Sequence, residues 1–250
     1  MASKTKRHLV IPDTQVKPGY DLSHLKWAGR AIEDYRPDTI VHLGDHWDMP
    51  SLSSYDKPGS RSKEGSRYRD DIDAGNEGME ILTEPFKGIK GYNPDMIFLT
   101  GNHENRIERA IEDDPVRLEG VIGYDDFELC GFRRYDFLEV LQLDGIVYSH
   151  YFQAAGTGRA IAGSIDNRLN KIGQSFIQGH QQGMNYGTRV LPTGKIYHGL
   201  VAGSFYRHDE AYMGQGNGHW RGLVVLNEVE DGNYDIMPLS ISYLEKKYGG

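Results

Sequence analysis

The stretch TIVHLGDHWD, residues 39–48, contains the pattern on which we base the fold of this chain. Residues 39–43 form an apolar run, and Gly44 and Asp45 end it. A short apolar run that stops at a turn signal is typical of a strand buried on both faces of its sheet. We therefore expect Asp45 to lie at the end of a buried strand.

The same arrangement occurs four more times along the chain. Apolar runs at 8–11, 96–100, 145–148 and 175–178 lead to Asp13, Asn102, His150 and His180, in that order. Open α/β sheets carry their ligand-binding groups at the carboxyl ends of the strands. Strand ends with oxygen and imidazole side chains therefore predict a metal site, and they are numerous enough for a dinuclear one.

Apolar periodicity and turn residues predict the remaining elements. Helical spacing is found over about 22–35, with His24 expected at the surface, over about 66–87, and beyond Asn102. From about residue 137, turn signals that predict hairpins stand at 143–145, 192–194 and 230–233. The expected fold class is α/β, a four-layer α-β-β-α sandwich of two mixed sheets with the metal site at the carboxyl ends of the strands. Without a repeat or a linker, residues 1–250 are expected to form a single domain.

The composition excludes several classes of protein. With 38% hydrophobic residues in 250, the chain can build a core, which excludes wholesale disorder. A net charge of −8 argues against a protein that coats polyanions generally. The sequence has no apolar run of about 18 residues and no signal-peptide pattern, so no membrane partner is expected. A single cysteine, Cys130, favours a reducing compartment and a cytoplasmic location.

Two of the strand ends carry longer motifs. The sequence GDHWD at 44–48 fits the pattern GD-x-x-D, and GNHE at 101–104 fits a second pattern. With Asp13 before them and His150 and His180 after them, the chain resembles the calcineurin-like metallophosphoesterase superfamily over about residues 9–204. The resemblance implies a metal-dependent phosphoester hydrolase with two divalent metal ions.

The resemblance also implies the metal ligands. Asp45 would bridge both ions, and Asp13 would belong to the first site. The second site would be completed by Asn102, His150 and His180.

The catalytic roles implied by the resemblance fall on His103 and Asp48. His103 would hold a phosphoryl oxygen or protonate the leaving oxygen, and Asp48 would orient its ring, because an acidic partner fixes the imidazole tautomer. A metal-bound hydroxide would be the nucleophile.

The chain departs from the family pattern at two candidate ligands of the first metal. Gln15 stands where the pattern D-x-H has histidine, and Gln182 stands where GH-x-H has its second histidine. The carbonyl oxygen of glutamine is a poorer ligand than imidazole for Zn²⁺ or Fe²⁺. We therefore expect a weak first site that favours Mn²⁺, with Mg²⁺, Fe, Zn²⁺ or Ni²⁺ as alternatives.

The substrate is indicated less directly. The basic stretch 57–69, which includes Arg61 and Arg67, is either a solvated surface loop or a phosphate-contacting flap, and the aromatic stretch 206–220 is either a rigid crossover or a cover that stacks on a base. The flap and the cover would favour a phosphodiester in DNA, RNA or a nucleotide. Arg106 and His46 are further candidates for substrate contact. The predicted activity is that of a phosphodiesterase or nuclease. A phosphomonoesterase acting on proteins or small molecules is the second interpretation, and a low-activity pseudoenzyme with a depleted first metal site is the third.

Overall fold

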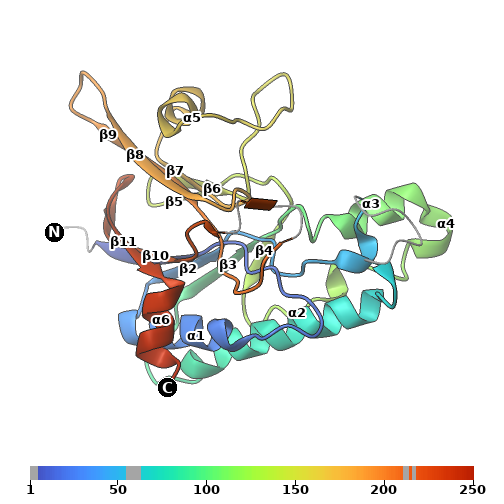
Figure 1. Ribbon diagram of the computed structural model, residues 1–250. Helices are drawn as coiled ribbons and strands as arrows, with labels where there is room; N and C mark the ends of the chain where they lie inside the picture. The colour runs from blue at the N-terminus through green and yellow to red at the C-terminus, as the bar shows by residue number, and fades with distance from the viewer. Residues whose placement is uncertain (1–4, 55–62, 211–213, 216–217) are drawn as a thin grey trace.

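The computed structural model describes residues 5–54, 63–210, 214–215 and 218–250. Two β-sheets are stacked face to face, and helices cover the outer face of each sheet (Figure 1). This is the predicted four-layer α-β-β-α sandwich with two mixed sheets, so the expected fold class is confirmed.

The first sheet contains six strands in the order β11-β10-β1-β2-β3-β4. Strands β1 to β4 pair in parallel, whereas β10 is antiparallel to both β1 and β11. The strands are β1 (Lys6–Ile11), β2 (Thr39–His42), β3 (Asp95–Leu99), β4 (Arg133–Tyr135), β10 (Gly222–Glu230) and β11 (Asn233–Ser240).

The second sheet contains five strands in the order β5-β6-β7-β9-β8. Its three central strands pair in parallel, and antiparallel β5 and β8 form its edges. The strands are β5 (Leu141–Leu143), β6 (Ile146–Ser149), β7 (Phe176–Gln178), β8 (Met184–Val190) and β9 (Ile196–Ala202).

Helices form the two outer layers. The first sheet is covered by α1 (Ser23–Tyr35), α2 (Tyr68–Thr83) and α6 (Ile241–Tyr248), and the second by α5 (Ile165–Ile172) (Figure 1). The short helices α3 (Arg106–Asp113) and α4 (Pro115–Leu118) follow β3, and 3₁₀ turns occur at η1 (Pro50–Leu52), η3 (Glu84–Phe86) and η4 (Tyr124–Asp126).

Strand β1 shows why its last three residues, 9–11, are all apolar. Leu9 and Ile11 belong to the core cluster that includes Leu25 of α1, whereas Val10 belongs to the cluster between the sheets, which includes Ile177 of β7. Successive side chains of a strand point to opposite faces, so both faces of this strand are buried. The carboxyl ends of the parallel strands in the two stacked sheets carry the segments described below.

Two expectations from the sequence are corrected by the structure. The turns at 143–145, 192–194 and 230–233 join antiparallel strands, as expected. The chain after residue 137 does not consist of hairpins alone, however, because β6 and β7 pair in parallel and α5 lies between them in the chain. Helix α5 has eight residues, of which only Ile165, Leu169 and Ile172 are apolar, and the turn signals around it favoured strands. His24 lies on the buried face of α1, against the ring of Phe205, and not at the surface.

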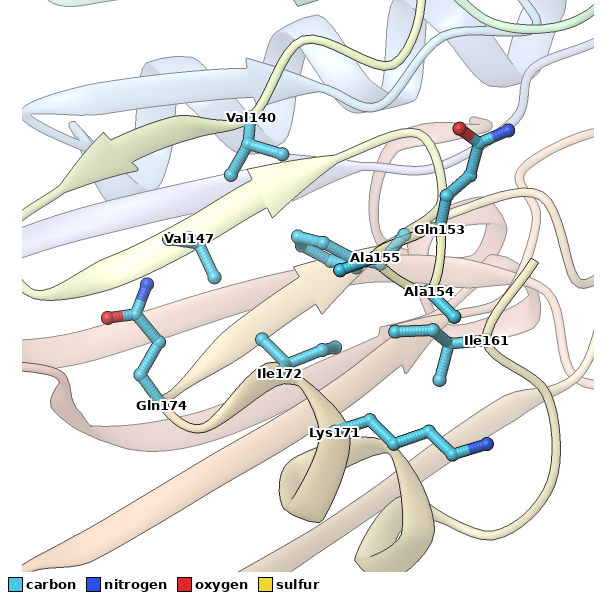
Figure 2. Close-up of a pocket in the computed structure, with 10 residues that line it drawn as sticks. Val140, Val147, Gln153, Ala154, Ala155, Ile161, Lys171, Ile172 and Gln174 are labelled. Carbon is cyan, nitrogen blue, oxygen red and sulfur yellow. The ribbon is translucent and has the colours of Figure 1, made fainter. Parts of the chain in front are cut away.

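An apolar hollow of about 440 Å³ lies beside α5 on the outer face of the second sheet (Figure 2). Val147, Ile161 and Ile172 line it, with Lys171 at its edge. None of its lining residues carries a carboxylate or an imidazole, so this hollow is not a metal site. Among the described residues, no helix combines the length and the apolar character needed to cross a membrane.

Candidate metal centre

The predicted ligands follow strands of both sheets. Asp45 and Asn102 come after β2 and β3, which are parallel neighbours in the first sheet. His150 and His180 come after β6 and β7, which are parallel neighbours in the second. The face-to-face stacking of the sheets brings these two pairs of loops together.

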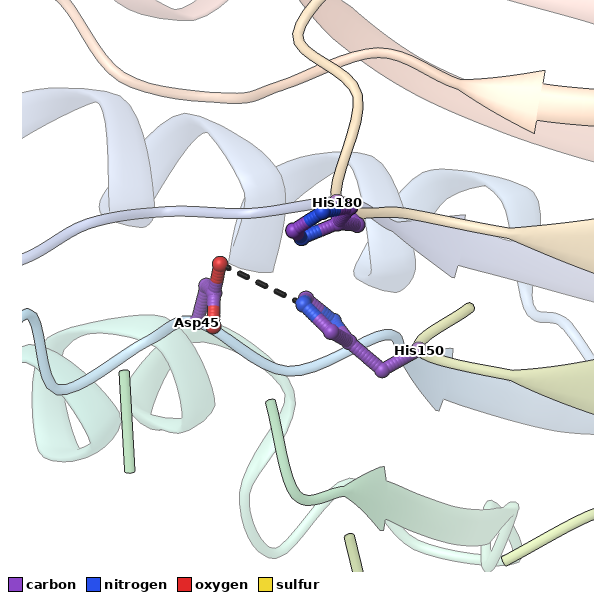
Figure 3. Close-up of side chains that lie close together, drawn as sticks. All are labelled: Asp45, His150 and His180. Carbon is purple, nitrogen blue, oxygen red and sulfur yellow. Dashed lines mark ion pairs between the residues drawn. The ribbon is translucent and has the colours of Figure 1, made fainter. Parts of the chain in front are cut away.

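Four of the predicted ligands converge on one point. One ligand atom from each of Asp45, His150 and His180 lies within 4.8 Å of the others (Figure 3). The Oδ1 atom of Asn102 is 2.9 Å from Nε2 of His150 and 2.7 Å from Nδ1 of His180. His150 Nε2 is also 3.4 Å from Oδ2 of Asp45 (Figure 3, dashed line). These are the residues expected at the second metal site.

The backbone fixes the orientation of the His150 ring. Its Nδ1–H donates a 2.7 Å hydrogen bond to the carbonyl oxygen of Leu43, just before the Asp45 loop. In a neutral ring this proton leaves the lone pair of Nε2 pointing at Asp45 and Asn102. A backbone acceptor behind a ligating histidine is a common way to set its tautomer.

The centre carries negative charge that suits a cation. Burial, together with neighbouring Asp45, raises the pKa of the Asp13 carboxyl to about 7. Burial opposes ionisation of Asp45, but His103 and His150 outweigh it and hold the pKa of Asp45 below its usual range. Burial would also lower the pKa of His150, yet Asp45 and Asp13 raise it to about 9. A divalent cation would be favoured by the same two carboxylates.

The candidate first site is built from oxygen and amide groups. The backbone N–H of His180 donates to Oδ1 of Asp13 (3.1 Å), and Nε2 of Gln182 donates to Oδ2 (3.3 Å). Oε1 of Gln182 is buried and has no hydrogen-bond partner within the described part of the chain. Gln15 is buried as well, and its backbone N–H donates to the carbonyl of Asp45. A buried acceptor beside a carboxylate fits a hard cation better than Zn²⁺.

His103 and Asp48 form a buried pair next to the ligands. Nδ1 of His103 donates to Oδ1 of Asp48, and Nε2 lies 3.8 Å from Oδ2 of Asp45. Burial lowers the pKa of His103, but the two aspartates outweigh it and raise the pKa above its ordinary value. The guanidinium of Arg106 donates to the backbone oxygen of Asp48, and its Nη2 lies 3.4 Å from His103 Nε2. Arg106 therefore lies beside His103 and Asp48, and its contact with a substrate stays a prediction.

The other candidates for substrate contact that the structure describes, His46 and Arg67, have partners within the protein. His46 is fully buried, its Nδ1 paired with Thr14 and its Nε2 with the carbonyl of Gly75, and burial lowers its pKa to about 4. The structure therefore does not support a substrate contact for His46, which belongs to the core beneath Asp45. Arg67 is exposed ahead of α2 and donates to the carbonyl of Ser66, while Arg61 lies outside the described residues.

Glu104 has a role that sequence reasoning did not identify. Its fully buried carboxylate accepts four backbone N–H groups, Oε2 from Asp45 and Gly101 and Oε1 from His46 and Trp47, at 2.6 to 2.9 Å. Glu104 thereby ties the loop after β2 to the loop after β3. The GNHE motif contained this residue, but its partners become visible only in the fold.

Comparisons with known proteins give distant likenesses. No protein-family model matches the chain. The chain is 28% identical over 191 residues to the "Gene 54 protein" of Mycobacterium phage D29, covering 70% of this chain and 69% of that protein. It is 29% identical over 186 residues to the protein of the same name in Mycobacterium phage L5, again covering 70% and 69% of the two chains.

One solved structure is similar over most of its length. The match to the crystal structure of TT1561 of Thermus thermophilus covers 94% of this chain and 99% of the TT1561 chain, with 10% sequence identity and a TM-score of 0.35. At these values the likeness assigns no function to this chain.

Proposed function

We propose that this chain is a metal-dependent phosphoester hydrolase, and that its substrate is a phosphodiester in DNA, RNA or a nucleotide. The observation that carries the proposal is the meeting of Asp45, His150 and His180 within 4.8 Å of one another, beside the buried His103–Asp48 pair. Metal ligands next to an acid–base residue are the groups that metal-assisted phosphoester hydrolysis uses.

The chain offers ligands of two kinds. Asn102, His150 and His180 would hold the ion of the second site together with Asp45. Asp13, Gln15 and Gln182 would contribute oxygens to the weaker first site, which shares Asp45. Such ions supply Lewis acidity toward a phosphoryl oxygen and make water a better nucleophile near neutral pH. The mixed donor set favours Mn²⁺, which accepts both imidazole and oxygen ligands.

His103 would move the proton that departure of the leaving group requires. Asp48 holds the Nδ1–H of its ring, so Nε2 is the nitrogen that faces the centre. A proton on Nε2 would pass to the leaving oxygen as the bond from phosphorus to that oxygen breaks. Arg106, next to Nε2, would place a positive charge beside the phosphoryl oxygens.

The preference for a diester is supported by what borders the centre. Ser204 forms an isolated parallel β-bridge with Asp13, and Nε2 of His219 lies 3.0 Å from the Ser204 hydroxyl. The aromatic stretch 206–220 therefore ends beside the candidate first site. Tyr206 is buried, so among the described residues of this stretch it is the half-buried Trp220 that would offer a ring to a base or a sugar of a nucleic-acid substrate.

Two model esters test the proposal. With Mn²⁺, the chain is expected to hydrolyse bis-p-nitrophenyl phosphate faster than p-nitrophenyl phosphate, and to cut labelled single-stranded DNA. Salt should weaken DNA cleavage strongly, because phosphate contacts are electrostatic. Absence of hydrolysis of both esters across a series of Mn²⁺, Mg²⁺, Zn²⁺ and Ni²⁺ would contradict the proposed activity, and faster monoester hydrolysis would contradict the substrate class.

A second candidate function rests on the amide of Gln182. Because Nε2 of Gln182 donates to Asp13, part of the first-site position is taken by a hydrogen bond within the protein. A pseudoenzyme would keep the Asp45–His150–His180 ligands and bind one ion without turnover. Calorimetric titration with Mn²⁺ distinguishes the two, since one tight event with no ester hydrolysis would favour the pseudoenzyme.

A further inference from the structure

Lys17 lies between two buried carboxylates beside the His103–Asp48 pair. Its Nζ is 2.6 and 2.7 Å from the two carboxylate oxygens of Glu210 and 3.4 Å from Oδ2 of Asp48. The side chain of Lys17 is only 16% exposed, against 7% for Asp48 and 6% for Glu210. The ammonium therefore has two fixed acidic neighbours and little solvent around it.

The two oxygens of Asp48 have different partners. Oδ1 accepts the Nδ1–H of His103, and Oδ2 faces the ammonium of Lys17. Rotation of the carboxylate would break both contacts at once. Lys17 therefore restricts the plane of the carboxylate that orients the His103 ring.

Glu210 fixes the position of the ammonium. Both its oxygens contact Lys17, and Oε1 also lies 2.6 Å from Nε2 of His208. His208 in turn stacks on the ring of the buried Tyr206, with ring centroids 4.7 Å apart. Lys17 is thus anchored more tightly to the segment after β9 than to Asp48 itself.

We infer that Lys17, anchored by Glu210, is a positioning residue that holds Asp48, and through it the His103 ring, in the orientation needed for proton transfer to the leaving oxygen. This inference rests on the proposed function. It assigns to Lys17 an action through Asp48, and not a contact with the phosphate.

Leaving-group dependence separates these two roles. Diphenyl phosphate has a poorer leaving group than bis-p-nitrophenyl phosphate and depends more on protonation of the departing oxygen. Lys17→Met should lower kcat for diphenyl phosphate about 10- to 100-fold, since a small displacement of a catalytic group has that effect. The loss for bis-p-nitrophenyl phosphate should be smaller, KM should change little, and Lys17→Arg should recover part of the rate.

Lys6→Met is the matched control. Lys6 also forms a close ion pair, 2.8 Å from Asp144, but it is about half exposed and stands at the start of β1, away from the carboxyl ends of the strands. This variant should keep the wild-type ratio of the two rates. An equal loss on both esters with a raised KM in Lys17→Met would indicate a phosphate contact and overturn the inference, as would unchanged kinetics.

A second readout does not depend on activity. The imidazole Nδ1–H of His103 should give a downfield proton resonance, assigned by its loss in His103→Ala. Lys17→Met should broaden or remove it, and Lys6→Met should retain it. Should Lys17→Met fail to fold, Glu210→Gln weakens the same anchor and is measured instead. If the wild type hydrolyses no ester, the proposed activity fails, while a resonance that persists in Lys17→Met or Glu210→Gln still overturns the positioning role.

Discussion

Replacing Glu104 by glutamine tests how the centre is held together. The carboxylate of Glu104 accepts four backbone N–H groups, two on each oxygen, from the loops after β2 and β3. The glutamine side chain has nearly the same shape but only one acceptor oxygen. Its NH₂ group would face two of the four N–H donors, which would then be buried without an acceptor.

The expected loss of stability follows from the two missing contacts. A hydrogen bond to a charged group contributes about 1.5–3 kcal/mol, so Glu104→Gln should lower the free energy of unfolding by roughly 3–6 kcal/mol. In a chain of 250 residues each kcal/mol shifts Tm by about 2–4 °C, which gives a decrease of roughly 6–24 °C. Because the released loops carry Asp45, Asn102 and His103, affinity for Mn²⁺ should fall as well.

Calorimetric unfolding and Mn²⁺ titration measure the two effects. The control is Glu108→Gln, the same substitution at an exposed position on α3, which should leave both quantities unchanged. A Glu104→Gln variant with the Tm and Mn²⁺ affinity of the wild type would refute the reasoning. It would mean that the two loops keep their positions without the shared carboxylate.

Three further changes test the ligand set, the acid–base residue and the core. Gln15→His combined with Gln182→His should add a tighter second binding event for Zn²⁺ in calorimetry, because imidazole is the better ligand. His103→Ala should lower kcat by about 10²–10⁴-fold while Mn²⁺ affinity, measured by titration, stays near wild type. Burial lowers the pKa of His24 to about 3 from 6.5, so the unfolded chain binds this proton first and stability falls as pH drops from about 6.5 toward 3. Between pH 7 and pH 5, the free energy of unfolding, measured with a chemical denaturant, should therefore decrease by about 2 kcal/mol less in His24→Leu than in the wild type.

The strand ends could be predicted from the sequence because two signals coincide there. The run 39–43 contains Ile40, Val41 and Leu43 and shows no polar alternation, which is typical of a strand buried on both faces, and Gly44 and Asp45 follow it. The ligands themselves needed no knowledge of loop geometry. Parallel strands bring their carboxyl ends to one edge of each sheet, and the stacking of the two sheets then brings the two sets of loops together.

Long-range polar partners could not be predicted in the same way. In the sequence, Glu104 precedes a predicted helix, where the helix dipole alone favours an acid. Its actual partners lie 57 to 59 residues away for three of the four N–H groups. Lys17 is separated from Glu210 by 193 residues. No local pattern encodes such contacts, since they depend on how two loops approach each other.

The backbone at the centre shows how the ligand residues are constrained. Gln15, Asp45 and His180 have φ values of 41°, 51° and 65°, in the left-handed region that residues other than glycine rarely adopt. Such conformations cost of order 1–3 kcal/mol each and persist only where the surroundings impose them. Here the backbone N–H groups of Gln15, Asp45 and His180 are held by the Asp45 carbonyl, Glu104 and Asp13 respectively.

The same three positions thus carry both backbone strain and candidate ligand atoms. A glycine at position 45 would relieve the strain of the positive φ angle, but it would remove the carboxylate that faces His150. Asparagine would keep both the shape and the strain while removing the charge. If the backbone strain at position 45 is tolerated because the carboxylate is needed to hold the metal, Asp45→Gly should unfold at a higher temperature than Asp45→Asn. Both variants should lose Mn²⁺ binding. Asparagine can also keep the 2.9 Å hydrogen bond from the backbone N–H of His103 to Oδ1, which glycine loses. A melting temperature of Asp45→Gly at or below that of Asp45→Asn would therefore mean that relief of the strain does not exceed the loss of this bond.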